Sequence, residues 1–437
     1  MNRKTKIFSL IFVFALISLP LQWVYATGSV RVAFIDTGIS TKHIDPVQVA
    51  EGKNYVFPAR DTEDRNGHGT ATSGMALGSS KLGLEGSCPD AVAVPLVTYD
   101  RYPSGVSQIG DVLVMCEAIY DAVDVFGCRV INISMGIPAE SEELRLAVEY
   151  AEEKGVVVVS AVGNDNLLHP NRRYYPAIYD TVIGVGAADN SVDGYMAADF
   201  SLHNGVSVLA KGANVKTVTN RNEGVPTIRS GTSYACAYVS GLCAQLLIDS
   251  PSLTPAQVRA LLYATAQDIG IPGVDIESGW GVVGINSPNS EPITRGMLAM
   301  LLYVYDGKPE SETSSFVDVL PGSYYETAVA WAAENDIIHG CGNGKFEPDK
   351  IITREQMAAI LYRYAQYKNY DVSLGKDTNF LSCNDIEKVS GYAILAMQWA
   401  CDTGLIQGSY GNLMPQVNIT KEQVATIFFR FSENVIP

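Results

Sequence analysis

The chain has 437 residues, enough for two domains, and 47% of them are hydrophobic, enough to fill ordinary cores. Its 47 acidic and 31 basic residues give a formal net charge of -16, which argues against nucleic acid as a partner. The eight cysteines divide five and three between the two domains proposed below, and none has zinc-finger spacing, so we assign no disulfide and no zinc site.

Residues 1–26 have the features of a secretory signal. Three basic residues and no acid flank an apolar run over residues 7–19, and residues 24–26 (VYA) end in a small residue that suits signal cleavage. We therefore expect the mature chain to start at Thr27. The alternative is an uncleaved membrane anchor, although the apolar run is short for a span. No other stretch of the sequence has the length and hydrophobicity of a membrane span.

Short apolar runs then alternate with helix-length segments. Their continuous apolar character is typical of strands buried in a parallel sheet. The runs are residues 32–35, 91–97, 130–135 and 156–161. Helices are expected over residues 107–126, 141–154 and 234–247, the last so apolar on all sides that it must be buried. The pattern predicts an α/β sandwich whose ligand crevice lies at the carboxyl ends of its strands.

Three motifs far apart in this region carry the parts of a hydrolytic site. Asp36 lies in FIDTG at the end of the first strand, His68 in NGHGT where a helix begins, and Ser233 in SGTS before the buried helix. Peptide hydrolysis needs a hydroxyl nucleophile, a base and a carboxylate that orients the base. Taken singly, each residue also has a structural interpretation, as a turn residue, a loop histidine and a helix cap.

Together, the motifs and their order in the chain resemble those of the subtilisin-like serine peptidases, over residues 30–286. The resemblance implies that Ser233 attacks the scissile carbonyl and forms an acyl-enzyme, that His68 transfers the proton, and that Asp36 orients the imidazole. It also implies that Asn164 and the backbone N–H of Ser233 stabilise the oxyanion. The peptidase domain would extend over residues 27–286.

The same resemblance implies substrate contacts. The segment NISMG matches the family's substrate-binding strand, so Ser134, Met135 and Gly136 are expected to pair with an extended peptide through their main chain. Asp165 follows Asn164, where an acid near the primary specificity pocket would favour a basic substrate residue. A solvated surface acid is the alternative for this residue.

The chain also departs from the family pattern. After the nucleophile the family has Met and then Ala-Ala-Pro-His, whereas this chain has YACAY over residues 234–238, so helix packing there must differ. Only residues 27–30 separate the expected cleavage site from the first strand, so either folding needs no prodomain or one acts in trans. Asp45 matches one ligand of the family's calcium site, which is weak support, and we assign no cofactor.

A second domain of different periodicity follows a polar stretch at residues 287–292, which we interpret as a linker. In it, Trp331 and Thr353 recur 68 and 67 residues later as Trp399 and Thr420. Each unit is predicted to contain a helix around the Trp, a Gly-rich turn and a helix capped by the Thr. We place a partial first repeat at residues 293–310, a second at 316–367 and a third at 380–433, in an all-α domain over residues 293–437.

These units resemble S-layer homology (SLH) repeats, which hold exported proteins on bacterial cell-wall polysaccharide. In that family three repeats form a prism whose grooves take acidic glycan, so the resemblance implies glycan contacts by Arg295, Arg354 and Lys421. The alternative is that the threonines cap helices and the cations are solvated. The first repeat lacks its upstream half with the Trp helix.

The sequence as a whole therefore predicts a secreted serine endopeptidase attached to the bacterial cell wall. Its partners would be a peptide or protein substrate and wall polysaccharide, with no nucleic acid and no membrane after signal cleavage. The alternative is a non-catalytic structural or adhesive wall protein whose peptidase-like domain binds peptides without cutting them. Processing and degradative roles are equally compatible with the sequence.

Overall fold

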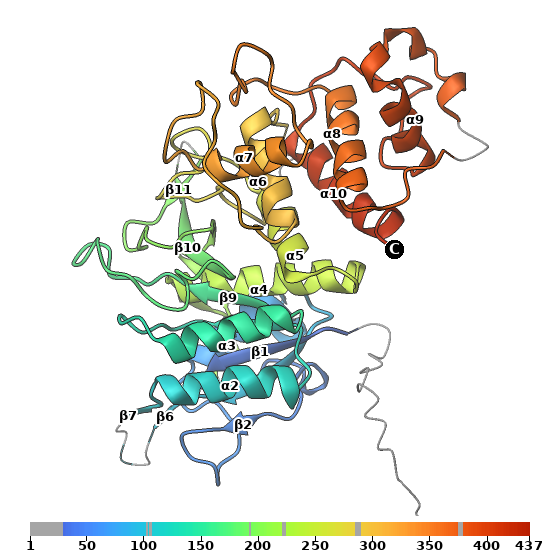
Figure 1. The fold of residues 1–437 in the computed structure, drawn as a ribbon. Helices are drawn as coiled ribbons and strands as arrows, with labels where there is room; N and C mark the ends of the chain where they lie inside the picture. Colours follow the sequence, from blue (N-terminus) through green and yellow to red (C-terminus); the bar gives the residue numbers. More distant parts are fainter. Residues whose placement is uncertain are drawn as a thin grey trace, which may run out of the picture.

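The computed structural model describes residues 29–101, 104, 107–191, 194–220, 224–284, 290–374 and 379–437. The predicted signal segment and the first half of the predicted linker lie outside these residues. Figure 1 shows an N-terminal part built on a sheet, coloured blue to yellow-green, and an orange to red helical part above it. Within the described ranges no helix is long and apolar enough to cross a membrane.

A mainly parallel sheet forms the centre of the N-terminal part. Its strands follow the order β11-β10-β9-β8-β1-β5-β2, and β12 also pairs with β10. They are β1 (Arg31–Asp36), β2 (Lys53–Asn54), β5 (Val92–Val97), β8 (Val130–Ile133), β9 (Val157–Ala161), β10 (Val182–Ser191), β11 (Gly194–Ala197) and β12 (Val208–Lys211). Ile35 lies opposite Leu96 and Ile133, in parallel register. The four strands predicted from apolar runs are confirmed, although β8 ends two residues early.

Helices cover both faces of this sheet. On one side Phe34 packs with α1 (His68–Leu77) and α4 (Thr232–Asp249), and on the other Ile35 packs with α2 (Val112–Asp124) and α3 (Glu142–Glu153). Successive strand residues point to opposite faces of the sheet, so one apolar run contributes side chains to two hydrophobic cores. The predicted α/β sandwich is confirmed.

One predicted helix starts later than expected. Ser107–Ile109 form strand β7, which pairs with β6 (Tyr99–Arg101), in place of the first turn of the helix predicted over residues 107–126. Asp111 then caps α2 by accepting a hydrogen bond from the backbone N–H of Val114, at 3.1 Å. The cap inside the predicted segment sets the true start of the helix.

Short strands and 3-10 turns lie between the longer elements in both parts. The remaining strands pair as β3 (Gly78–Ser79) with β4 (Leu84–Glu85) and as β13 (Val215–Thr217) with β14 (Thr227–Arg229). The 3-10 turns are η1 (Pro46–Gln48), η2 (Ser80–Leu82), η3 (Asn379–Ser382), η4 (Ile386–Lys388) and η5 (Gly391–Ala393). The last helix of the N-terminal part is α5 (Pro255–Thr265).

The C-terminal part is all-α, as predicted. Its helices are α6 (Arg295–Tyr305), α7 (Glu326–Glu334), α8 (Arg354–Tyr367), α9 (Ile394–Asp402) and α10 (Lys421–Asn434). Thr294, Thr353 and Thr420 each cap a helix by accepting a hydrogen bond from the backbone N–H three residues later. Trp331 lies in α7 and Trp399 in α9, both buried. The predicted helix-turn-helix repeats are confirmed.

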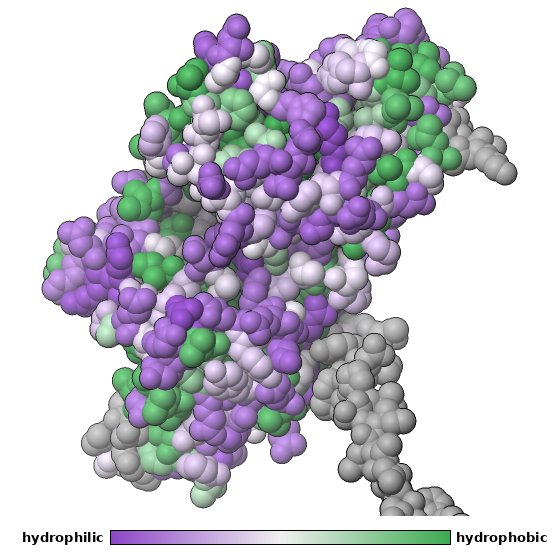
Figure 2. All heavy atoms as spheres, viewed as in Figure 1, coloured by the Kyte–Doolittle hydropathy of each residue, from purple (hydrophilic) through white to green (hydrophobic). Residues whose placement is uncertain are grey.

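Surface hydropathy differs between regions of the face seen in Figure 1. Figure 2 shows mainly hydrophilic residues along the seam between the two parts, and hydrophobic residues gathered at the upper right over α9. The exposed hydrophobic residues of α9 and of the 3-10 turns before it include Leu381, Tyr392 and Leu395. On this face, the apolar contacts between the two parts are therefore covered by polar side chains.

Candidate active site

β1 and α1 bring Asp36 and His68 together. Asp36 ends β1 and is fully buried, and His68 begins α1. His68 Nδ1 lies 2.7 Å from Asp36 Oδ1. The Thr72 hydroxyl donates to Asp36 Oδ2 at 3.0 Å, and the backbone N–H of Thr37 donates to Oδ1 at 2.7 Å. The carboxylate is therefore held so that it faces the imidazole.

A buried acid, Asp64, shapes the turn that leads into α1. Its Oδ1 accepts from the backbone N–H groups of the second and third residues after it, and its Oδ2 accepts from the N–H and hydroxyl of Thr70. At Gly69 an added Cβ would lie 2.2 Å from the carbonyl oxygen of Gly38, so His68 can approach β1 only because the next residue has no side chain. Asp64 was not predicted from the sequence, although an Asp before Asn-Gly is a turn signal.

Opposing effects set the pKa of His68. Burial lowers this pKa, but the charge and hydrogen bond of Asp36 raise it more, so the net pKa lies above the ordinary value. The more distant charges of Asp64 and Arg229 act in opposite directions, the first raising it and the second lowering it. A raised pKa makes the neutral imidazole a stronger base, which is available only above a pH higher than that of an ordinary histidine.

Ser233 lies in the first turn of α4, against β8. Its Oγ donates to the backbone carbonyl of Ser134 at 2.9 Å, and Ser134 Oγ donates to the carbonyl of Ser233 at 3.0 Å. Asn132 Nδ2 donates to Ser134 Oγ at 2.9 Å, which fixes this pair from the core side. Among the hydrogen bonds of the described residues there is none between Ser233 and His68. Rotation about the Cα–Cβ bond of Ser233 is therefore needed to align the hydroxyl with the imidazole.

Asn164 lies just after β9, beside the start of α4. Its Oδ1 accepts from the backbone N–H of Thr232 at 2.7 Å, which leaves Nδ2 as the donor for a ligand. A cavity of about 330 Å³ brings Asn164 together with Ser233 and the predicted substrate-binding strand. It is lined by Ser134, Met135, Gly136, Ala161, Gly163, Asn164, Asp165, Tyr174, Thr232 and Ser233. Asp36 and His68 do not line this cavity.

Asp165 lines the cavity but already has a cationic partner. The guanidinium of Arg172 donates to Asp165 Oδ2, and the Tyr174 hydroxyl donates to the same oxygen at 3.3 Å. In the described part of the chain Asp165 Oδ1 is buried and has no hydrogen-bond partner. Arg172 offsets the charge that would attract a basic substrate residue. A preference for basic substrate residues would therefore depend on Asp165 Oδ1.

The unusual residues after the nucleophile occupy defined positions. The Tyr234 ring lies 5.9 Å from the His68 ring, measured between centroids, and Cys236 Sγ donates a weak hydrogen bond to Asn132 Oδ1 at 3.3 Å. The Tyr238 hydroxyl donates to a backbone carbonyl at 3.1 Å. α4 thus holds Ser233 at its amino end, although the residues that follow Ser233 differ from the family pattern.

Comparison with known proteins decides the family. The Subtilase family model matches residues 27–281, which include all four candidate catalytic residues. The chain belongs to the subtilase family. This subtilase is 34% identical to subtilisin DY of Bacillus licheniformis over 251 residues, which are 56% of this chain and 86% of that protein. It is 33% identical to fervidolysin of Fervidobacterium pennivorans over 298 residues, 62% of this chain but only 42% of fervidolysin.

Solved structures of similar fold agree with this assignment. The crystal structure of fervidolysin, described as a keratinolytic enzyme related to subtilisin, aligns with a TM-score of 0.53 at 29% identity and covers 62% of this chain and 46% of that one. Sphericase aligns with a TM-score of 0.52 at 29% identity, over 60% of this chain and 94% of that one. The chain is a subtilisin-like serine endopeptidase with, in its C-terminal part, an S-layer homology domain matched over residues 315–358.

Among the described residues of this subtilase there is no group of three or more His, Cys, Asp or Glu side chains that could hold a metal ion. Asp45 instead caps η1, its carboxylate accepting from the backbone N–H of Val47 at 3.1 Å.

Seven cysteines of the described ranges are free thiols: Cys88, Cys116, Cys128, Cys236, Cys243, Cys341 and Cys401. Cys236 and Cys243 are fully buried in α4, as the apolar helix pattern predicted. Burial raises the pKa of the Cys243 thiol to about 12, so it stays protonated and unreactive at neutral pH. These thiols are structural.

The three cations predicted to bind glycan are buried, which contradicts the alternative that they are solvated. Arg295 donates to the backbone carbonyl of His339 at 2.7 Å, and Arg354 donates to that of Gln407 at 3.1 Å. Each arginine therefore braces the Gly-rich turn of the following repeat. Lys421, only 4% exposed, pairs with a glutamate, Glu291.

A second arginine, not predicted from the sequence, lies near each of these two arginines: Arg430 near Arg354, and Arg363 near Arg295. A cavity of about 280 Å³ contains both Arg354 and Arg430. Arg430 also donates to the backbone carbonyl of Leu405 at 3.3 Å, and Arg363 donates in the same way to Ile337, one repeat earlier, at 2.8 Å. The recurrence of this arginine 67 residues apart was the available sequence signal.

Proposed function

We propose that the chain is a secreted serine endopeptidase held on the cell wall, with Asp36, His68 and Ser233 as its triad. The observation that carries the proposal is the 2.7 Å contact between His68 Nδ1 and Asp36 Oδ1. A carboxylate that accepts a hydrogen bond from Nδ1–H keeps the proton of the neutral imidazole on Nδ1. Nε2 is then unprotonated and can deprotonate a hydroxyl. The family membership of residues 27–281 supports the same roles.

The proposed reaction starts when an extended peptide pairs with the main chain of Ser134, Met135 and Gly136. A substrate N–H that takes the carbonyl of Ser134 releases the Ser233 hydroxyl, which turns to His68. His68 accepts the proton as Ser233 attacks the scissile carbonyl, and then donates it to the leaving amine. Water, deprotonated by the same imidazole, hydrolyses the acyl-enzyme.

Negative charge develops on the carbonyl oxygen during each attack. The Nδ2 group of Asn164 and the backbone N–H of Ser233 are the proposed donors to that oxygen. Because Oδ1 of Asn164 is fixed by Thr232, Nδ2 is already oriented before the substrate binds, so no reorganisation is needed in the transition state. Asp165 is the proposed contact for the substrate side chain before the scissile bond, weakened by Arg172.

Labelling with a serine-reactive fluorophosphonate tests whether the site is catalytic. The mature wild-type chain should be labelled, because His68 activates the hydroxyl, and Ser233→Ala should not be. Ser230→Ala is a matched control in the same motif, since the exposed Ser230 hydroxyl only accepts from the Asn214 backbone, and it should be labelled normally. A folded wild-type protein that resists labelling would instead support a non-catalytic wall protein.

We further propose that acidic wall glycan binds where Arg354 and Arg430 meet. Two guanidinium groups in one cavity can grip a carboxylate in several places. The match to the S-layer homology domain supports association with the cell wall, which lies outside the membrane and so requires export by the segment proposed as a signal. The mature protein would then remain on the cell surface.

Cosedimentation with purified cell walls tests this site. Arg430→Gln should weaken wall binding at least tenfold, because a charge-assisted hydrogen bond contributes about 1.5–3 kcal/mol. Lys388→Gln, at an exposed position of the same repeat, changes the net charge equally and should leave binding intact. Equal losses in the two variants would contradict a specific site and indicate general charge attraction.

A further inference from the structure

The three capped helices of the C-terminal part are arranged around a pseudo-threefold axis. The residues just before the caps form a closed ring of backbone hydrogen bonds: Ile293 donates to Ile419 at 3.1 Å, Ile419 to Ile352 at 3.0 Å and Ile352 to Ile293 at 3.2 Å. Matching aromatic residues near the other ends of the helices meet with ring centroids 5.7 to 6.3 Å apart: Tyr305, Tyr364 and Phe431. The ring therefore closes although the first repeat is incomplete.

Two of the three seams between these helices are covered by a Trp helix. Trp331 of α7 lies beside Tyr303 of α6 and Tyr364 of α8, at 5.6 and 6.4 Å between centroids. Trp399 of α9 lies between α8 and α10 in the same way. In a complete first repeat, a Trp helix would cover the third seam, between α10 and α6. The first repeat lacks this helix.

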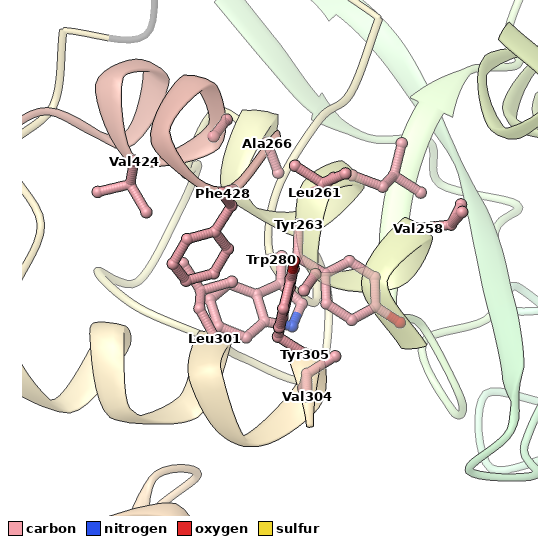
Figure 3. Packing of buried hydrophobic residues seen from close by; sticks show 14 of the residues in the cluster. Val258, Leu261, Tyr263, Ala266, Trp280, Leu301, Val304, Tyr305, Val424 and Phe428 are labelled. Carbon is pink, nitrogen blue, oxygen red and sulfur yellow. The ribbon is translucent and has the colours of Figure 1, made fainter. Parts of the chain in front are cut away.

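α5 of the peptidase part covers this third seam. It packs against both α6 and α10. Figure 3 shows its side chains among those of the two SLH helices, and all belong to one hydrophobic cluster that continues into the peptidase core. The residues labelled there include Leu261 and Tyr263 of α5, Leu301 and Tyr305 of α6, and Val424 and Phe428 of α10. An indole is present as well, because Trp280 stacks on Tyr263 at 5.4 Å.

We infer that α5 replaces the missing Trp helix, so that the peptidase completes its own wall-binding module. The polar contacts of the seam agree with this. The backbone N–H of Lys421 donates to Glu291 as that of Arg295 donates to Lys350 one repeat away, and the Lys421 ammonium pairs with the Glu291 carboxylate at 3.0 Å. The third site is therefore closed internally, which leaves two sites for glycan.

This arrangement fixes the direction in which the peptidase faces. Ser233 lies in the first turn of α4, whereas Leu246 in its last turns faces α10 across an apolar groove of about 570 Å³. The two residues are about 20 Å apart along the helix, at 1.5 Å per residue. The catalytic cavity thus lies away from the wall-binding module. The shared hydrophobic cluster keeps the module and the sheet in this orientation.

Cutting the connection between the two parts tests the inference. A recognition sequence for a site-specific cysteine protease would be inserted between Gly284 and Ser290 in a Ser233→Ala background, which prevents self-digestion. After cleavage of the folded protein, the two fragments should coelute in size-exclusion chromatography and separate only in denaturant. The readout needs neither peptidase activity nor wall binding, so its result is independent of the proposed function.

Matched variants identify the seam as the cause. Leu301 is 1% exposed and faces α5, so Leu301→Asp should make the fragments separate after cleavage. Leu395 is 59% exposed on α9, and Leu395→Asp should leave the fragments together. On the uncut chain, Leu261→Ala should accelerate amide hydrogen exchange in α6 and α10. This measurement tests the inference even if the chain with the inserted recognition sequence, or the Leu301→Asp variant, misfolds. Folded wild-type fragments that separate on cleavage, or exchange unchanged by Leu261→Ala, would overturn the inference.

Discussion

Replacing His68 or Ser233 by alanine should each reduce kcat by about 10⁶-fold, and the double replacement should cost little more; both are behaviours known from subtilisin. The reason is that the two side chains act in one step: without the base the hydroxyl keeps its proton, and without the hydroxyl the base has nothing to activate. Turnover of a chromogenic peptide by the mature chain, with the concentration of folded enzyme determined separately, measures the loss.

Ser230→Ala is the control, since it removes a hydroxyl three residues away without touching the proposed site. It should retain normal turnover. Single variants that lose less than a hundredfold, or losses that multiply in the double variant, would show that His68 and Ser233 do not act on the same proton.

Asp36→Asn should lower kcat by about 10⁴-fold, a magnitude measured in a serine peptidase of another fold, because an amide there favours the wrong imidazole tautomer. It should also move the acid limb of the pH profile. Asp36 raises the pKa of His68 while burial lowers it, so removing the carboxylate charge leaves burial and lowers that pKa. The small remaining activity should therefore persist to lower pH than in the wild type, as measured by kcat/KM against pH.

Arg229→Gln supplies a control of opposite sign. Arg229 is exposed and lowers the pKa of His68, so its loss should shift the acid limb slightly to higher pH with little change in kcat. An Asp36→Asn profile that shifts upward, or does not shift, would show that the carboxylate does not control the imidazole.

Local patterns in the sequence determined the elements of this protein. Continuous apolar runs predicted β1, β5, β8 and β9, and threonines before helical periods predicted the caps of α8 and α10. These features depend on residues within one or two turns of each other, so they can be read without knowing the path of the chain. The motifs around Asp36, His68 and Ser233 identified the family for the same reason.

Only the tertiary structure decided what these residues touch. Asp165 meets Arg172 beside the catalytic cavity, Ser233 donates to Ser134 from 99 positions away, and Arg354 donates to the turn of the next repeat. The replacement of a missing repeat helix by α5 has no local signal, because it depends on where α6 and α10 come to lie against α5. Such contacts depend on which surfaces the whole chain brings together, and burial then determines whether a charge is paired or free.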